Sequence, residues 1–287
     1  MTEPLVIRAS SLSSFGDCQL RAAGSMFASQ FQAHGHDVRR PRANIGALIG
    51  TGVHRAAEVA LTEKMVSSST AALSTMEDAA VESFRQRMAE DAGDLPVVMD
   101  QETPTIAAAL SQIPRLVRRY RDDVVEHVVP VAVESRIEAE AMPGVILSGQ
   151  ADLLVLDAAK GRRTLRDAKT GRRRQNPWKH APQCGAYSAL FRSRGYEVDA
   201  GQIDFLARVK EQAEQPPVEE QKIDIIACEQ IAWHVLQDFG SKALAFAADG
   251  DPGRFLPNPG SHLCSPLFCR LYGSSACAAT KGAPDAA

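Results

Sequence analysis

The chain has 287 residues, of which 45% are hydrophobic and 23% are charged, and its formal net charge is -3 at pH 7. This balance is typical of globular proteins and excludes a chain that is disordered throughout. No apolar run reaches the roughly 18–20 residues of a membrane-spanning helix, and no basic stretch followed by an apolar one opens the sequence. We therefore expect a soluble, cytoplasmic protein that has no membrane partner.

The first half of the sequence is predicted to be mainly helical. Ser10–Ser13 offers several N-caps for a helix that runs toward Phe31. Apolar residues at helical spacing predict further helices over Ile45–Met65, Ala71–Met88 and Ile106–Val125. Glycine and proline at 93–96 indicate a loop.

The second half alternates between strands and helices. Strands are predicted over Val129–Glu138, Val145–Asp157, Arg163–Lys169, Ile203–Val209 and Gln221–Ile226. Helices are predicted over Pro177–Arg194 and Cys228–Ala248. Alternation in the first strand predicts one shared side for Val131, Val133, Ser135 and Ile137. Little regular structure is expected after Pro252, and Gly282–Ala287 is predicted to be a frayed tail.

This order of elements predicts an α/β (α+β) fold in which helices flank a mixed β-sheet. We expect a helical N-terminal region over 1–128 and a core over 129–250. A cysteine-containing segment over 251–280 and a flexible tail over 281–287 complete the predicted organisation.

Two carboxylates and an ammonium are predicted to meet on one hairpin. If the loop is residues 158–161, Asp152 faces Asp167 across the two strands, and Lys169 leaves the same face as Asp167. Two opposed carboxylates destabilise a sheet unless a cation neutralises them, and Mg²⁺ or Mn²⁺ would do so. The alternative is a surface hairpin whose charges merely alternate.

A basic segment surrounds this hairpin. Lys160–Lys179 contains nine lysine or arginine residues and a single acid. This local excess could hold a polyanion such as DNA, although a solvated hairpin edge explains the charges equally well.

Four short motifs resemble RecB-like nucleases of the PD-(D/E)XK superfamily. They are Gly50–His54, Gly149–Asp152, Asp167–Gly171 and Gln183–Tyr187, in the order in which that family shows G-x-x-x-H, G-x-x-D, D-x-K-T-G and Q-x-x-x-Y. The resemblance implies a restriction-endonuclease-like core and a metal-dependent DNA nuclease. We expect this nuclease to be an exonuclease that acts on single-stranded DNA or on free ends.

The resemblance also assigns roles to individual residues. It implies metal ligands at His54, Asp152, Asp167 and the carbonyl of Ala168. It implies that Lys169 is the catalytic lysine and that Gln183 and Tyr187 lie near the metal and the DNA backbone. Glu58 shares a helix face with His54 but matches no motif, so we expect it to be solvated or paired with an arginine.

Three cysteines are concentrated in the irregular C-terminal segment. Cys264, Cys269 and Cys277 follow a C-x4-C-x7-C spacing, and ligation would explain three thiols in a segment with so little core of its own. Cys18 is the candidate fourth ligand. Cys184 and Cys228 fall in or at predicted helices, where cysteines are typically small buried hydrophobes.

This cysteine pattern resembles the iron–sulfur subgroup of RecB-like nucleases, which includes the AddB nuclease domain, CRISPR-adaptation nucleases and phage-type members. There, one N-terminal and three C-terminal cysteines hold a [4Fe–4S] cluster, which implies a structural clasp between the two ends of this chain. The spacing of these cysteines is wider than the C-x2-C-x5-C common in that subgroup. The alternative to the cluster is a Zn²⁺ ion bound by the same four thiolates.

Two other functions compete with the nuclease. One is a non-catalytic DNA-binding or helicase-associated module, and the other is an unrelated metal-cluster protein with incidental hairpin charges. The sequence contains no Walker-type G-x-x-x-x-G-K-[ST] motif, so any helicase, recombination or CRISPR partner would act in trans.

Overall fold

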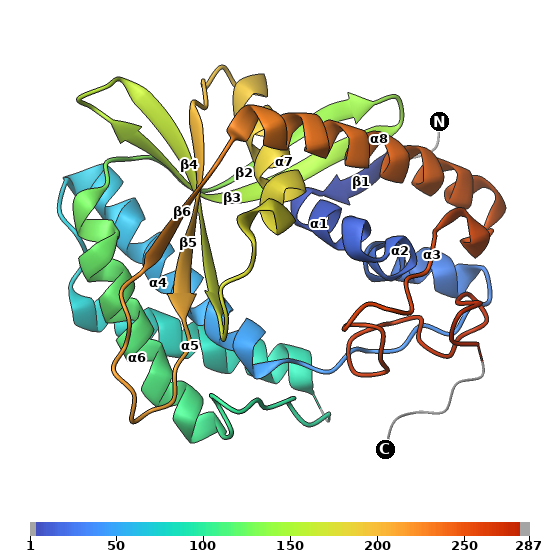
Figure 1. Ribbon diagram of the computed structural model, residues 1–287, viewed down its shortest axis with the longest axis horizontal. Helices are drawn as coiled ribbons and strands as arrows, with labels where there is room; N and C mark the ends of the chain where they lie inside the picture. The colour runs from blue at the N-terminus through green and yellow to red at the C-terminus, as the bar shows by residue number, and fades with distance from the viewer. Residues whose placement is uncertain (1–3, 94, 282–287) are drawn as a thin grey trace.

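A mixed six-stranded sheet forms the centre of the computed structural model, which describes residues 4–93 and 95–281 (Figure 1). Its strands are β1 (Leu5–Arg8), β2 (Pro130–Met142), β3 (Val145–Asp157), β4 (Arg162–Gly171), β5 (Ala200–Ala207) and β6 (Glu219–Ile223). The order is β1-β3-β4-β5-β6, and β2 pairs with β3. β1 is parallel to β3 and β4 to β5, whereas the other pairs are antiparallel. The tail predicted for 282–287 lies outside the described residues.

Eight α-helices surround this sheet within the described part of the chain. They are α1 (Ala9–Asp17), α2 (Gln19–Met26), α3 (Ala28–Ala33), α4 (Ile45–Ser67), α5 (Leu73–Ala92), α6 (Ile106–Asp123), α7 (Ala181–Ser193) and α8 (Ile225–Asp249). Short 3₁₀ turns lie at Val125–His127, Pro177–His180 and Pro252–Arg254. Side-chain oxygens of Asn44 and Asp224 cap the N-termini of α4 and α8 by accepting backbone N–H groups, so the two longest helices begin at favourable residues.

The N-terminal region departs from its prediction in two ways. The single helix expected to run toward Phe31 is wrong: Cys18 has an extended backbone and Phe27 a non-helical one, so three short helices replace it. The strand β1 was not predicted, because four residues are too few to show a clear alternation.

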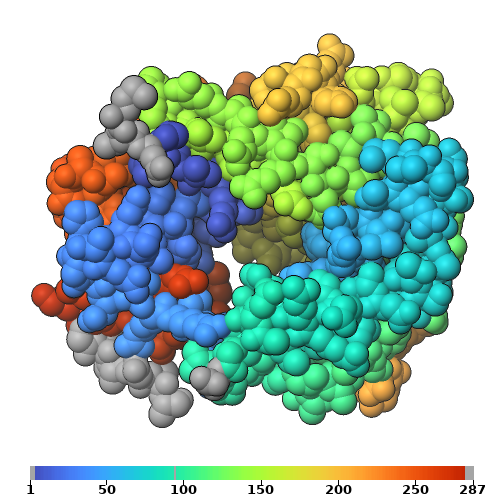
Figure 2. Space-filling model, turned by 180° about the vertical axis from the view of Figure 1, so that it is seen from behind, coloured from blue at the N-terminus to red at the C-terminus, as the bar shows by residue number. Residues whose placement is uncertain are grey.

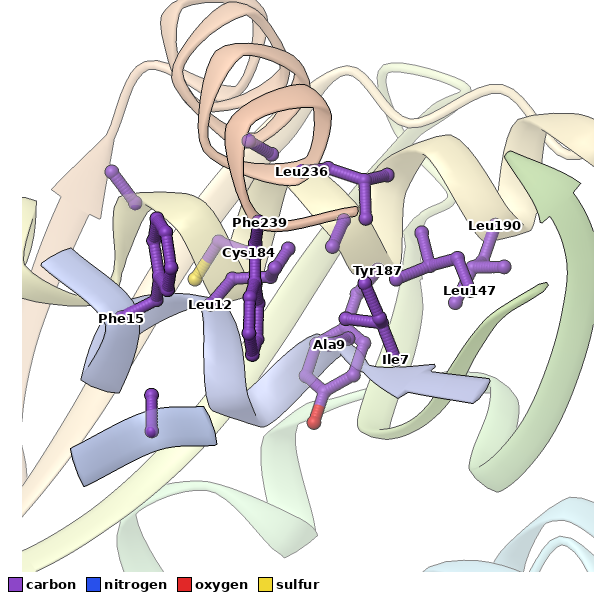
Figure 3. Close-up of a cluster of buried hydrophobic side chains, with 14 of the residues drawn as sticks. Ile7, Ala9, Leu12, Phe15, Leu147, Cys184, Tyr187, Leu190, Leu236 and Phe239 are labelled. Carbon is purple, nitrogen blue, oxygen red and sulfur yellow. The ribbon is translucent and has the colours of Figure 1, made fainter. Parts of the chain in front are cut away.

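Two hydrophobic clusters cover the two faces of the sheet. One contains side chains of α1–α3, α7, α8 and the C-terminal segment, and Figure 3 shows part of it. Stacked rings within this cluster, Phe15 on Phe239 and Phe31 on Phe246, bring the N-terminal helices against α8. The other cluster contains α4, α5 and α6. The sheet is therefore a middle layer, and helices on both of its faces can contribute side chains to one site.

The alternation predicted for β2 is broken at Glu134. This residue has a φ of 43°, a left-handed conformation that a non-glycine residue rarely adopts. Val133 consequently packs against the α4–α6 cluster, whereas Ile137 belongs to the opposite one, so the shared side predicted for them is wrong.

One edge of β3 is divided between two partners. β1 pairs with β3 as far as Ser148, and β4 pairs with it from Leu153 onward. Residues 149–152 lie between the two paired runs, and we call this opening the fork. Tyr187 of α7 packs against Gly149 here, and a Cβ atom on Gly149 would lie 3.0 Å from its ring.

Candidate active site

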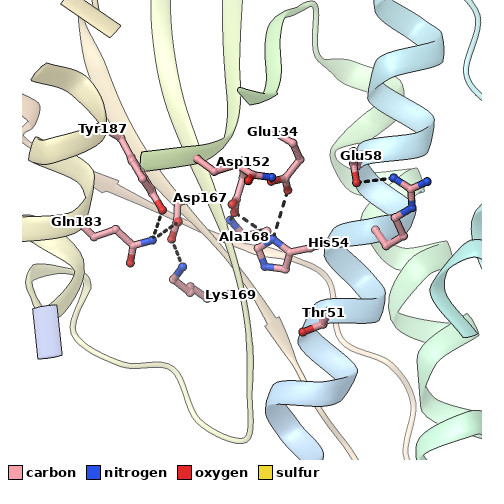
Figure 4. Close-up of polar contacts among 12 residues, drawn as sticks. Thr51, His54, Glu58, Glu134, Asp152, Asp167, Ala168, Lys169, Gln183 and Tyr187 are labelled. Carbon is pink, nitrogen blue, oxygen red and sulfur yellow. Dashed lines mark hydrogen bonds and ion pairs between the residues drawn. The ribbon is translucent and has the colours of Figure 1, made fainter. Parts of the chain in front are cut away.

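Three potential metal ligands converge beside the fork from three different elements. α4 contributes His54, β2 contributes Glu134 and β3 contributes Asp152 (Figure 4). Nδ1 of His54 lies 3.4 Å from Oδ2 of Asp152 and 3.8 Å from Oε1 of Glu134. One ligand atom from each residue lies within 4.8 Å of the others, so one nitrogen and two carboxylate oxygens could share an ion.

Glycines allow α4 to bring His54 this close to the sheet. A Cβ atom on Gly50 would lie 2.9 Å from Oγ1 of Thr170 in β4. A Cβ atom on Gly52 would lie 2.7 Å from the carbonyl oxygen of Ala80 in α5. A larger residue at position 52 would push α4 away from the α5 backbone, and one at position 50 would require the Thr170 side chain to move, which gives a physical reason for glycines before His54.

Asp167 and Lys169 leave the same face of β4, as predicted. Nζ of Lys169 lies 2.6 Å from Oδ2 of Asp167, which is fully buried. The side-chain amide of Gln183 donates to Oδ1 of Asp167 at 3.2 Å and lies 3.0 Å from the hydroxyl oxygen of Tyr187. The spacing of the two α7 residues thus places both side chains beside the carboxylate (Figure 4).

The register between β3 and β4 agrees with the loop length inferred from the sequence. Leu153 faces Arg166, and the paired residues end there, one position before Asp152 would face Asp167. Beyond that point the side chain of Asp152 accepts the backbone N–H of Ala168 at 2.8 Å. The structure therefore brings the two acids together through this side-chain contact rather than through a continued ladder.

Burial and neighbouring charge separate the proton affinities of the two acids. Burial raises the pKa of Asp167 to about 6, and the negative charge of Asp152 adds to this effect against the opposing ammonium of Lys169. For Asp152, burial is outweighed by the charge of His54, and the pKa is lowered. An additional positive charge at this position would favour ionised Asp167.

The two cationic groups are held in their protonated forms. Burial alone would lower the pKa of His54, but the carboxylates of Asp152 and Glu134 raise it to about 10. Burial likewise opposes the ammonium of Lys169, yet the charges of Asp167 and Asp152 raise its pKa. In the absence of a metal, the positive charges on His54 and Lys169 balance the carboxylates, and a divalent cation could supply the same balance.

Most of the predicted residues meet at this site, and one further residue joins them. His54, Asp152, Asp167, Lys169, Gln183 and Tyr187 are brought together, and the N–H of Ala168 is part of the same network. The metal-ligand role of the Ala168 carbonyl stays a prediction. Glu58 pairs with Arg55 at 2.7 Å, which confirms the expectation for it.

Glu134 was missed in the sequence. It lies in a strand whose apolar alternation drew attention to its neighbours, and its own orientation depends on the left-handed backbone at this position. The only available signal was an acidic residue within an otherwise apolar stretch of a strand adjoining the Asp152 strand.

Four cysteines line a single pocket between the start of α2 and the C-terminal segment. They are Cys18, Cys264, Cys269 and Cys277. The backbone N–H of Asn258 donates to the sulfur of Cys18 at 3.3 Å. Burial raises the pKa of Cys264, and the nearby thiols of Cys277 and Cys18 raise it further.

The spacing of these sulfurs bears on what they can ligate. Within residues 4–93 and 95–281, no three of the sulfurs lie within 4.8 Å of one another. A zinc tetrahedron with bonds of about 2.3 Å would hold them closer than that. Cys184 and Cys228 are 1% and 0% exposed in the core, as expected of small buried hydrophobes.

The basic segment is less free than its composition suggests. Arg166 forms a buried pair with Asp204 at 2.8 Å, and Lys169 pairs with Asp167. Three others also have acidic partners: Lys160 with Asp157, Arg172 with Glu102 and Arg174 with Glu219. Only part of the local excess is available to a polyanion.

Comparisons with known proteins agree with this arrangement. A family model described as the PD-(D/E)XK nuclease superfamily matches residues 8–273. A search of the curated proteins found no match. Among solved structures, a "putative exonuclease" from Eubacterium rectale is similar with a TM-score of 0.56 and 12% identity, over 91% of this chain and 87% of that one. This likeness concerns the fold alone.

A second solved structure has a lower TM-score. The alkaline exonuclease of Laribacter hongkongensis has a TM-score of 0.31 and 15% identity, over 78% of this chain and 97% of that one. Separately, no helix among the described residues has both the length and the apolar character needed to cross a membrane.

Proposed function

This chain belongs to the PD-(D/E)XK nuclease superfamily, and from that premise we propose that it is a metal-dependent DNA exonuclease acting on single strands or free ends. The reaction is hydrolysis of phosphodiester bonds. Unwinding of a duplex substrate would come from a helicase in trans, because the chain has no Walker-type motif.

The convergence of ligands beside the fork carries this proposal. His54, Glu134 and Asp152 offer ligand atoms within 4.8 Å, and the paired Asp167 and Lys169 are close enough to Asp152 to feel its charge. The carboxylates suit a hard divalent cation such as Mg²⁺ or Mn²⁺, and the single imidazole nitrogen is more compatible with Mn²⁺ than with Mg²⁺. The donor set therefore fits the metal that the superfamily implies.

We assign the metal-binding role to His54, Glu134, Asp152, Asp167 and the Ala168 carbonyl. A bound divalent cation would neutralise charge on the reacting phosphate and lower the pKa of the attacking water. His54 gives up its proton to act as a ligand, and Asp167 must be ionised. The network of Gln183 and Ala168 holds the two aspartates in place for this role.

Lys169 is assigned to the reacting phosphate. Its raised pKa keeps it a cation at neutral pH, which suits stabilisation of negative charge in the transition state and orientation of a water molecule. Gln183 and Tyr187 position Asp167 and border the approach to the site.

The decisive experiment is a cleavage assay on end-labelled linear, circular and single-stranded DNA. We expect release of nucleotides from linear and single-stranded substrates in Mg²⁺ or Mn²⁺, and none with a chelator. Cleavage of circular DNA would show endonuclease activity instead. Binding of DNA with no cleavage in either metal would favour the non-catalytic module.

We also propose that Cys18, Cys264, Cys269 and Cys277 hold a [4Fe–4S] cluster with a structural role. Support comes from the single pocket that they line and from the N–H group directed at Cys18. The cluster would clasp the start of α2 to the C-terminal segment. Iron and acid-labile sulfide analysis of the purified protein tests this against zinc.

A further inference from the structure

A polar pocket opens at the fork, next to the candidate active site. It is lined by residues from β1, α1, β2, β3 and α7: Arg8, Ser10, Arg136, Ser148, Gln150 and Tyr187. We call it the fork pocket. Figure 2 shows the molecule hollowed where the dark-blue N-terminal segment, the green strands and the cyan helices meet.

The sheet places two guanidinium groups at this pocket. Arg8 is the last residue of β1 and faces Ser148 of β3, while Arg136 of β2 faces Gln150 on the other edge of β3. Arg136 is paired with Glu138 at 3.0 Å, which restrains it. Within the described ranges, Arg8 is exposed and has no acidic partner. Among the described residues, the pocket therefore contains one cation without an acidic partner, whereas the hydroxyl of Ser148 already donates to Glu138 at 3.0 Å.

Hydrogen bonds connect the walls of the pocket to the candidate metal centre. The side-chain amide of Gln150 donates to Oε2 of Glu134 at 2.9 Å. Tyr187 forms the opposite wall, and its hydroxyl lies 3.0 Å from the amide of Gln183, which bonds Asp167. Figure 3 shows the Tyr187 hydroxyl directed away from the surrounding apolar side chains. An anion in the pocket would thus lie one side chain away from the proposed metal ligands.

The wall of the pocket begins about one phosphate spacing from the proposed metal ligands. Gln150 precedes Asp152 by two residues, which corresponds to about 6.6 Å of extended strand, a length comparable to the separation of successive phosphates on one DNA strand. Arg8 pairs with Ser148, two residues further along β3, so its long side chain has to extend toward Gln150 to reach that phosphate. Arginine guanidinium and hydroxyl groups are common phosphate ligands, and they fix the register of a nucleic acid without reading its bases.

We propose that the fork pocket binds the DNA phosphate adjacent to the one that is hydrolysed, with Arg8 as its principal cation. The proposal rests on the proposed nuclease function. It makes Arg8 and Ser10 residues that set the register of the strand, so that one particular phosphodiester bond is presented to the metal centre.

A series of single-stranded oligonucleotides tests this, each carrying one neutral methylphosphonate in place of a phosphate. Binding is measured by fluorescence anisotropy in the Lys169→Ala background, and wild-type cleavage products identify the scissile phosphate. We expect neutralisation of its neighbour to raise Kd by about 10- to 100-fold, the usual effect of losing a charged hydrogen bond. A series with no penalty at that neighbour overturns the proposal.

Adding Arg8→Gln identifies the partner of that phosphate. We expect the penalty at the neighbouring position to fall to within about twofold, whereas penalties elsewhere remain, since removing both partners of one contact is not additive. The slope of log Kd against log salt concentration should also become shallower by about 0.7. Ser10→Ala should reduce the penalty at the same position. Arg194→Gln, an exposed arginine at the far end of α7, is the matched control and should change neither measurement.

The outcomes separate this proposal from the one on which it rests. If wild-type protein cleaves DNA but Arg8→Gln leaves the position profile unchanged, only the fork pocket assignment fails. A position-specific loss that depends on Arg8, in a protein that never cleaves DNA, would retain the phosphate site and overturn the nuclease function. No binding of DNA by folded protein overturns both.

Discussion

The backbone N–H of Ala168 donates a 2.8 Å hydrogen bond to Oδ2 of Asp152, at the point where β3 and β4 stop pairing. The carboxylate takes the place of the next strand partner and holds the end of β4 beside the fork. Asp167 and Lys169 flank Ala168, so this one contact brings both side chains into register with Asp152. The short turn between β3 and β4 thus places two acidic side chains and one ammonium at the same site.

Asp167→Ala and Lys169→Ala are each expected to lower kcat/KM for DNA cleavage by about 10²- to 10⁴-fold, because each removes a charge that acts on the reacting phosphate or its metal. The measurement is single-turnover cleavage of end-labelled DNA, and circular dichroism should show an unchanged fold. Lys160→Ala is the matched control, since this exposed lysine pairs with Asp157 on the hairpin tip. Full activity of either site variant would falsify the assigned roles.

Glu134→Gln is expected to weaken Mn²⁺ binding by about 10- to 100-fold or more. Loss of a group that only supports a metal ligand typically has an effect of this size. The amide keeps the size of the side chain but offers a weaker, uncharged donor. Isothermal titration calorimetry provides the measurement. Glu140→Gln, on an exposed position of the same strand, should bind Mn²⁺ like the wild type. Equal affinities for the two variants would remove Glu134 from the site.

Metal binding is expected to release a proton from His54. The pKa of this residue is about 10 without metal, so apparent Mn²⁺ affinity should rise by up to about tenfold per pH unit between about pH 7 and 9. Calorimetry in buffers of different ionisation enthalpy counts the proton directly. His54→Gln should bind more weakly and with little pH dependence, and a steep dependence that persists in this variant would assign the proton elsewhere.

The raised pKa of His54 also stabilises the fold of the metal-free protein. The pKa of His54 rises from 6.5 to about 10 on folding, so the folded state binds this proton more tightly than the unfolded state. The resulting stabilisation is fully present below pH 6.5 and is lost as the pH rises toward 10. Denaturation curves of wild type and His54→Gln should converge toward the alkaline end of this window.

Cys269→Ser is expected to abolish iron binding and to lower Tm by several degrees, since loss of a ligand opens the clasp between α2 and the C-terminal segment. Iron content, visible absorbance and thermal melting are the measurements. Cys184→Ala is the control: it creates a cavity in the core and lowers Tm, but it should retain iron. Stoichiometric zinc in place of iron in the wild type would contradict the cluster.

Gly185→Ala is expected to destabilise the fold by about 1–3 kcal/mol or more, because the added methyl has no space. Its Cβ atom would lie 2.0 Å from the carbonyl oxygen of Cys228, so α7 and α8 would have to separate. Urea denaturation measures the change. Gly16→Ala has no neighbour within 4 Å and should be neutral or stabilising within α1. Equal stability of the two variants would show that the helix contact is looser than described.

Local pattern was sufficient to predict much of this structure. The helix α4 and the hairpin of β3 and β4 have strong periodicity and a defined loop, so their positions and register followed from the sequence. The same register predicted that Asp152, Asp167 and Lys169 would meet. Ion pairing and the shared charge effects among them agree with this prediction.

What could not be predicted depends on contacts distant in sequence or on unusual backbone geometry. β1 is recognisable only through its parallel pairing with β3, some 140 residues later. Glu134 reaches the site because its backbone is left-handed, and no periodicity rule anticipates such a residue. The breaks at Cys18 and Phe27 likewise arise from packing against α8 and the C-terminal segment, not from local propensity.

The packing of α7 against α8 has a consequence for the order in which this enzyme becomes active during its synthesis. α7 carries Gln183 and Tyr187, and it approaches α8 closely at Gly185, where the two helices share one hydrophobic cluster. On the ribosome, every proposed catalytic side chain emerges before α8 does. We therefore expect Gln183 and Tyr187 to be held beside Asp167 only after α8 has docked on α7, so that folding of the last long helix precedes hydrolysis of DNA.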